Sequence, residues 1–155
     1  MDGSENSYET TLKAITEGEW AGWNNYAGGD PFEEYCGPYY WRRDPDGTMR
    51  CAFRAERKHM NGGMFMHGGA IMTFADYALF VIAREALQNS HSVTATFNGE
   101  FVGSVPEGAI VECTGEVVKA GRSMVFVRGL ITTGPDPVMS FSAVIKKTGP
   151  RDKRS

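Results

Sequence analysis

The stretch that decides the fold spans residues 61–87 and reads NGGMFMHGGAIMTFADYALFVIAREAL. Its glycine turn, His67-Gly68-Gly69, opens a helix whose residues 70–83 carry a single charge, Asp76. A helix that is apolar on every face is buried, and fourteen residues are too few to span a bilayer. A buried carboxylate is costly unless it is paired or used. We therefore expect Asp76 to be a buried acid with a chemical role, against the alternative of an Asp satisfied by nearby hydroxyl or backbone groups.

The spacing between Gly68 and Asp76 sets a limit on how they act. The backbone N–H groups at the start of a helix attract an anion or a carbonyl oxygen, although a plain loop-to-helix turn also explains the glycines. Asp76 lies eight residues further on, about 12 Å along the helix axis. Two groups that act on one carbonyl must each approach within ~3 Å. If both act, the spacing implies a two-fold dimer in which Asp76 of one subunit lies near Gly68 of the other.

Composition narrows the class of protein. The chain has 155 residues and a net charge of −3, which suits one domain and argues against non-specific nucleic-acid binding. Three scattered cysteines suggest reduced thiols, and the polar start of the chain and the lack of a long apolar run predict a cytoplasmic protein that does not enter a membrane. The histidines and cysteines lack metal-ligand spacing, and no Gly-x-Ser-x-Gly elbow or phosphate loop is present.

Residues 1–30 are predicted to be an extension. A short helix is expected over residues 8–18, with Ser7 as its N-cap, followed by an aromatic loop or broken helix. That segment either covers apolar surface or forms a lid over a ligand pocket. The main domain is expected to span residues 31–148, and residues 149–155 to form a disordered tail.

The rest of the chain predicts antiparallel strands. Residues 39–43 and 48–57 flank the turn Asp44-Pro-Asp-Gly47, which indicates a hairpin. After the helix, which is expected to end near Leu87, four β-rich segments are separated by short turns with no room for crossover helices; they span residues 92–102, 109–119, 123–132 and 138–147. The fold class is therefore α+β, with about five or six antiparallel strands wrapped round one long helix.

The pattern Asn61, five residues, His67-Gly68-Gly69, six residues, Asp76 resembles the hot-dog thioesterase superfamily in its phenylacetate-pathway (PaaI-type) branch. The resemblance covers residues 31–148 and includes the strand order after the helix. It implies a hot-dog fold, a homodimer that often assembles into a homotetramer, and hydrolysis of acyl-CoA thioesters, with CoA as part of the substrate and no separate cofactor.

The resemblance also assigns roles to residues. Asp76 would be the general base or nucleophile, the N–H of Gly68 would polarise the thioester carbonyl from the opposite subunit, and Asn61 would orient the thioester or water. Further roles implied by the resemblance are bracing of the turn by His67, holding of the attacking water by Thr94, and binding of the substrate by Gly69. Near the CoA phosphates the resemblance places a turn formed by Lys119, Gly121, Arg122 and Ser123.

Two other functions share the expected fold. One is a non-catalytic hot-dog protein that binds acyl-CoA or another small ligand, for which a buried Asp76 has no use. The other is a hot-dog dehydratase or hydratase, in which His67 and Asp76 would transfer protons. The adjacent Gly-Gly and the upstream Asn61 favour the thioesterase.

Overall fold

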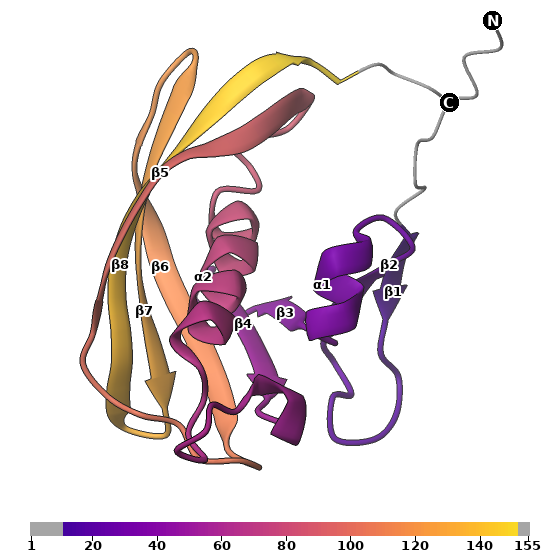
Figure 1. Ribbon diagram of the computed structural model, residues 1–155. Coiled ribbons are helices and arrows are strands. Elements are labelled where there is room, and N and C mark those ends of the chain that lie inside the picture. Colours follow the sequence, from indigo (N-terminus) through magenta and orange to yellow (C-terminus); the bar gives the residue numbers. More distant parts are fainter. Residues whose placement is uncertain (1–10, 152–155) are drawn as a thin grey trace, which may run out of the picture.

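A computed structural model describes residues 11–151, which form one antiparallel sheet folded around a central helix, α2 (Gly68–Ile82) (Figure 1). The sheet has eight strands in the order β1-β2-β3-β4-β6-β7-β8-β5. The strands are β1 (Thr11–Ala14), β2 (Asn24–Ala27), β3 (Tyr40–Arg43), β4 (Met49–Arg54), β5 (Ser90–Phe101), β6 (Ile110–Ala120), β7 (Met124–Thr133) and β8 (Asp136–Pro150). Two short helices complete the fold, α1 (Pro31–Cys36) and the 3-10 helix η1 (Arg57–His59). The α+β class is confirmed, with eight strands in place of five or six.

The extra strands come from the N-terminal segment. The helix predicted over residues 8–18 is wrong where the structure describes it, because residues 11–14 form β1 and pair with β2; Ser7 and Tyr8 lie outside the described residues. Gly18 has a φ of +78°, which suits a turn between the two strands. The aromatic side chains fix this hairpin to the sheet, since the Trp20 ring stacks on Tyr40 with centroids 4.3 Å apart. Tertiary contacts of this kind override a weak local helix preference.

One face of α2 forms the centre of the hydrophobic core. Phe74, Ala78 and Leu79 are fully buried beneath β4, β6 and β7, because the curved sheet covers that face. The predicted helix to Leu87 is too long: α2 ends at Ile82, and turns continue to Asn89, whose φ is +63°.

The opposite stripe of α2 is open in the single chain. Gly69, Met72 and Asp76 are exposed and recur at helical spacing along one face. The expectation that Asp76 is buried is therefore wrong for one protomer. A single sheet bends around only part of a helix, so one stripe remains for another partner.

The strand predictions after the helix are confirmed with small shifts of their ends. β8 continues to Pro150, beyond the expected start of the tail at residue 149, while residues 152–155 lie outside the described part. β5 pairs only with β8 and so forms one edge of the sheet. Across residues 11–151, no helix combines the length and the apolar character needed to cross a membrane.

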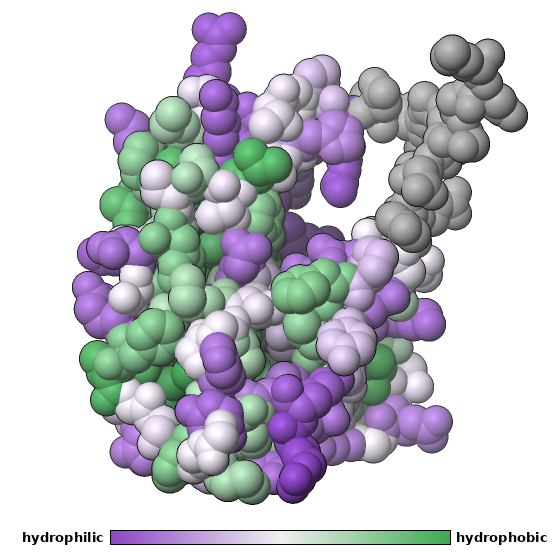
Figure 2. All heavy atoms as spheres, in the orientation of Figure 1, coloured by the Kyte–Doolittle hydropathy of each residue, from purple (hydrophilic) through white to green (hydrophobic). Residues whose placement is uncertain are grey.

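Apolar side chains are exposed along this edge and on the neighbouring helix stripe. Val93 and Phe101 of β5 are each 52% exposed and Met72 of α2 is 42% exposed. Figure 2 shows apolar side chains, in green, among polar ones over the region that β5 occupies in Figure 1. An unpaired edge strand bordered by apolar side chains is a surface suited to pairing with another chain.

Candidate active site

Asp76 is held by a threonine from the edge strand. Thr94 on β5 donates its hydroxyl hydrogen to Oδ1 of Asp76, with an oxygen–oxygen distance of 2.6 Å. A hydrogen bond from a hydroxyl to a carboxylate at this distance is short and charge-assisted. The bond fixes one carboxylate oxygen, while Oδ2 has no partner within residues 11–151. Asp76 is thus an oriented carboxylate on the open stripe of α2.

A bulge in β5 lies next to this threonine. The register between β5 and β8 shifts between Thr94, which pairs with Ile145, and Thr96, which pairs with Val144. The intervening Ala95 therefore has no partner in the ladder. A bulge re-aims nearby side chains and recurs beside functional sites, which accounts for the approach of Thr94 to the helix.

The glycine turn presents a free N–H at the start of α2. His67 is the N-cap, and its Nδ1 accepts from the N–H of Gly69 at 2.8 Å. Since Nδ1 accepts, a neutral His67 carries its proton on Nε2. The N–H of Gly68 has no acceptor among the described residues. Its glycine backbone lies against β5, since a Cβ added there would meet the Phe101 ring at 3.4 Å.

Asn61 organises the loop that leads to this turn. Its Oδ1 accepts from the N–H groups of Gly63 at 2.8 Å and Phe65 at 3.3 Å, and the loop includes Met64 with a φ of +64°. The side-chain nitrogen of Asn61 has no acceptor within residues 11–151. The amide N–H₂ therefore remains available to a ligand.

The predicted CoA-binding turn joins β6 to β7. The N–H of Gly121 donates to the carbonyl of Met124 at 2.8 Å, and Lys119, Arg122 and Ser123 are exposed. A further cation, which the sequence did not predict, lies beside this turn. β8 brings Lys147 there, and its Nζ lies 3.4 Å from the carbonyl oxygen of Gly121. Lys147 and Gly121 are 26 residues apart in the sequence, so only the pairing of β7 with β8 reveals this cluster of positive charge.

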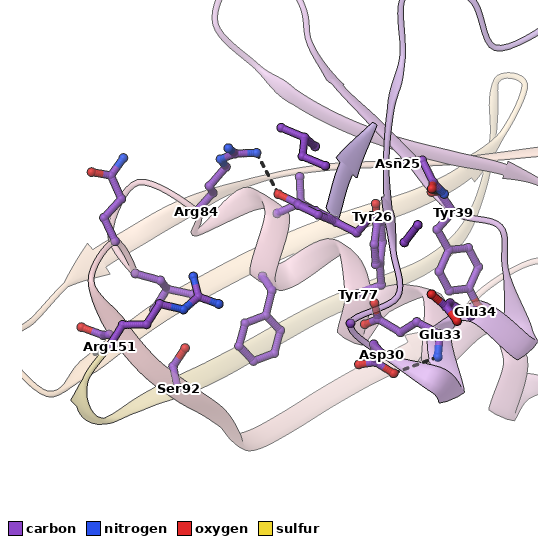
Figure 3. A pocket seen from close by; sticks show the side chains of 18 of the residues that line it. Asn25, Tyr26, Asp30, Glu33, Glu34, Tyr39, Tyr77, Arg84, Ser92 and Arg151 are labelled. Atoms are coloured by element: carbon purple, nitrogen blue, oxygen red, sulfur yellow. Dashed lines mark hydrogen bonds between the residues drawn. The ribbon is translucent and has the colours of Figure 1, made fainter. Parts of the chain in front are cut away.

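A cavity of about 840 Å³ lies between α1, the β1–β2 hairpin, the second half of α2 and the start of β5 (Figure 3). Its apolar walls include Tyr39, Tyr77, Phe80 and Val81. The hydroxyl groups of Tyr39 and Tyr77 are buried and have no hydrogen-bond partner. Burial is also the main reason that the pKa of each tyrosine is raised.

Acidic groups gather at the α1 end of the cavity. Burial, and then the charges of Asp30 and Asp76, raise the pKa of Glu33 to about 7. Figure 3 shows Glu33 beside Asp30, whose Oδ1 accepts from the Glu33 backbone N–H at 3.0 Å. No group of three or more His, Cys, Asp or Glu between residues 11 and 151 is arranged to hold a metal ion. Tyr77, the residue that follows Asp76 on α2, lines the cavity together with Glu33.

One chain brings together some of the predicted site residues and separates others. Asp76 and Thr94 form a direct hydrogen bond, and His67, Gly68 and Gly69 share one turn. Gly68 and Asp76 are separated, because Gly68 begins α2 and Asp76 lies two helical turns further along it. Glu33 and the cavity were not predicted from the sequence. The only indication in the sequence was that Glu33 lies within an aromatic segment. Its burial depends on the packing of α1 against α2.

Comparisons with known proteins agree with this architecture. The sequence model of the family described as "Thioesterase superfamily" matches residues 63–140. A Pseudomonas aeruginosa protein named as a candidate esterase, PA0474, is 30% identical over 115 residues, which cover 74% of this chain and 86% of that protein.

Solved structures show the same fold at low sequence identity. A hypothetical thioesterase protein of Streptococcus pneumoniae, crystallised with coenzyme A, has a TM-score of 0.65 and 19% identity, covering 74% of this chain and 88% of that one. The PaaI protein from the phenylacetic acid degradation operon of Escherichia coli has a TM-score of 0.68 and 18% identity, covering 79% and 87%. The structures share the hot-dog fold, and the family match extends over half of the chain. This chain belongs to the thioesterase superfamily.

Proposed function

We propose that the protein hydrolyses acyl-CoA thioesters, with Asp76 as the acid that attacks the carbonyl or activates the attacking water. The single observation that carries this proposal is the Thr94–Asp76 hydrogen bond on the open stripe of α2. A carboxylate with one oxygen fixed by a hydrogen bond and the other accessible is suited to act on a substrate. Membership of the thioesterase superfamily and the coenzyme A in the pneumococcal structure support the choice of substrate.

In the proposed reaction the unpartnered Oδ2 of Asp76 takes a proton from water as the water oxygen bonds to the thioester carbon. The C–S bond then breaks, and the thiolate of CoA leaves with the proton. The same geometry allows direct attack by Oδ2 on the thioester carbon, which breaks the C–S bond, releases the CoA thiolate and gives a mixed anhydride that water then hydrolyses to the free acid and the Asp76 carboxylate. Thr94 would hold the carboxylate in place in both routes, and a fixed N–H on the carbonyl oxygen typically contributes ~3 kcal/mol to the transition state.

The N–H that polarises the carbonyl would come from a second copy of the chain. Gly68 and Asp76 lie eight residues apart on one helix, about 12 Å along its axis, so they do not reach one carbonyl together. The open stripe of α2 and the exposed edge of β5 suit a two-fold dimer in which the α2 helices of two protomers run antiparallel. The Gly68 N–H of one protomer would then face Asp76 of the other, with Asn61 beside it.

The β6–β7 turn would bind the phosphates of CoA. Lys119, Arg122 and the neighbouring Lys147 supply positive charge there, and Gly121 and Ser123 shape the turn. Phosphate recognition by such cations is favourable but depends on salt concentration. The cavity, whose wall includes Tyr77 next to Asp76 in the sequence, would accept the acyl group.

The test is thiol release from a panel of short, medium and aryl acyl-CoAs, with Asp76→Asn and Asp76→Ala as controls. We expect turnover of at least one thioester and a loss of about a thousandfold or more in kcat for both variants, as for other residues essential to acyl transfer. Absence of thiol release from every thioester, together with hydration of an enoyl-CoA, would instead support a hydratase. Full activity of Asp76→Ala would refute the assignment of Asp76.

A further inference from the structure

The cavity has a basic end as well as an acidic one. Arg84 and Arg151 line it at the C-terminal end of α2 and the end of β8, together with Tyr26 of β2. Figure 3 shows both arginines on the opposite side of the cavity from Asp30 and Glu33. The charges of Arg84 and Arg151 both lower the pKa of Tyr26 against the larger, raising effect of its burial.

Arg84 is held in place but not neutralised. Its Nη1 donates to the Tyr26 hydroxyl at 2.8 Å, and its guanidinium carbon lies 4.4 Å from the centroid of the Trp41 ring. The adjacent acid, Glu85, pairs instead with Arg43 at 2.6 Å. Arg84 forms no ion pair with any carboxylate in residues 11–151. A half-buried, pre-oriented guanidinium with unused N–H donors is a receptor for a carboxylate or phosphate.

The position of Arg84 relative to Asp76 defines which part of a substrate would reach Arg84. Arg84 lies eight residues beyond Asp76, and the wall between them is apolar, with Tyr77, Phe80 and Val81. The helical part from Asp76 to Ile82 rises about 9 Å along the axis, a further turn leads to Arg84, and the two side chains cover part of the separation themselves. A thioester whose carbonyl lies at Asp76 would extend a chain of roughly six carbons past these side chains to the arginine.

We infer that Arg84 selects acyl groups that end in a carboxylate, so that the substrates are CoA thioesters of medium-length dicarboxylic acids. This inference rests on the proposed function and specifies its substrate class. A methyl-ended chain of the same length would displace water from the half-buried guanidinium without offering an acceptor to its unused N–H donors, which is unfavourable. Asp30 and Glu33 lie at the opposite end of the cavity from Arg84 (Figure 3), away from the far carboxylate.

The experiment compares adipyl-CoA with hexanoyl-CoA, which have the same chain length and differ in the terminal group. We expect the wild-type kcat/KM to be about tenfold or more higher for adipyl-CoA, as for a charge-assisted hydrogen bond. Arg84→Gln should lower kcat/KM for adipyl-CoA by about tenfold to a hundredfold, mainly through KM, and change that for hexanoyl-CoA by less than about twofold. Arg84→Lys, which keeps the charge, should retain part of the preference.

Arg43→Gln is the matched control, because Arg43 lies near the same end of α2 but outside the cavity, paired with Glu85. It should leave the preference unchanged. The wild-type comparison does not depend on how well any variant folds. Equal kcat/KM for the two thioesters in the wild type, or an adipyl preference that survives in folded Arg84→Gln, would overturn the inference and leave thioester hydrolysis standing.

Calorimetric titration with free adipate and hexanoate separates the two proposals. Adipate that binds about tenfold or more tightly than hexanoate, and loses that advantage in Arg84→Gln, supports the anion-binding end of the cavity without any turnover. If no thioester is hydrolysed, the proposed function fails and with it the substrate class, whatever the titration gives. If thioesters are hydrolysed but adipate binds no better than hexanoate, only the inference about Arg84 fails.

Discussion

Thr94 Oγ1 lies 2.6 Å from Asp76 Oδ1 and joins the edge strand of the sheet to the exposed stripe of its central helix. The two residues are 18 positions apart in the sequence and meet because β5 bulges after Thr94. The contact links the sheet edge, where a second chain would pair, to the carboxylate that would act on substrate.

Replacement of Thr94 by Val should lower kcat by about tenfold to a hundredfold. Valine has a similar shape but no hydroxyl, so Asp76 would lose its orienting hydrogen bond. Thr94→Ser, which keeps the hydroxyl, should retain most of the rate. Thiol-release kinetics on the best acyl-CoA measure this, and the prediction fails if Thr94→Val matches the wild type or if Thr94→Ser is equally impaired.

Glu33 should make stability depend on pH. Burial, followed by Asp30 and Asp76, raises its pKa from 4.5 to about 7, so between these values the folded protein binds more protons at this site than the unfolded chain does. The free energy of unfolding therefore falls as the pH rises through this window. Glu33→Gln removes this effect and should be more stable than the wild type at pH 8, on the order of 1 kcal/mol after allowance for solvent screening.

Urea denaturation at pH 5 and at pH 8 measures the effect of Glu33→Gln. The difference from the wild type should be small at pH 5 and appear at pH 8. Glu107→Gln, an exposed acid outside the cavity, is the control. A Glu33→Gln variant that is less stable than the wild type at pH 8 would contradict a raised pKa.

A charge on the open stripe of α2 should disrupt the proposed dimer. Met72 is 42% exposed and lies one helical turn before Asp76, so Met72→Glu would bury a charge in the interface, at a cost of several kcal/mol. We expect Met72→Glu to be a monomer, as measured by light scattering, and to have little thioesterase activity, as measured by thiol release. The control is Val118→Glu, which places the same charge at another exposed apolar position, on β6, and should leave the assembly intact. A wild-type protein that is monomeric at micromolar concentration would contradict the shared site.

Two glycines opposite each other in the sheet should be sensitive to any side chain. Gly115 on β6 pairs with Gly129 on β7, and a Cβ at Gly115 would clash with the Arg128 carbonyl oxygen and lie 2.8 Å from Ile82 Cδ1 and 2.9 Å from Gly129 Cα. Gly115→Ala should lower the free energy of unfolding by about 2 kcal/mol or more.

The control for Gly115→Ala is Gly149→Ala on β8, where an added Cβ meets no atom within 4 Å. It should change the free energy of unfolding by less than about 0.5 kcal/mol. Chemical denaturation measures both variants. Equal stabilities of the two alanine variants would show that the strands move apart at little cost.

The local features of the fold could be predicted from the sequence. The alternating β-rich segments, the short turns between them and the apolar run after His67-Gly68-Gly69 match β3 to β8 and α2. The N-terminal hairpin could not be predicted, because β1 and β2 have little intrinsic preference and depend on packing of Trp20 and Trp23 against the sheet. Propensity is a weak guide where tertiary contacts decide the conformation.

The sequence by itself determined the pattern Asn61, His67-Gly68-Gly69 and Asp76. It also determined that Gly68 and Asp76 do not act on one carbonyl within a single protomer, because eight helical residues separate them by about 12 Å. The tertiary structure alone decided that Asp76 is exposed, that Thr94 orients it, and that Glu33 and Arg84 line opposite ends of one cavity. These relationships join residues from separate elements, and their distances depend on how the sheet curves around α2. No local pattern in the chain encodes that curvature.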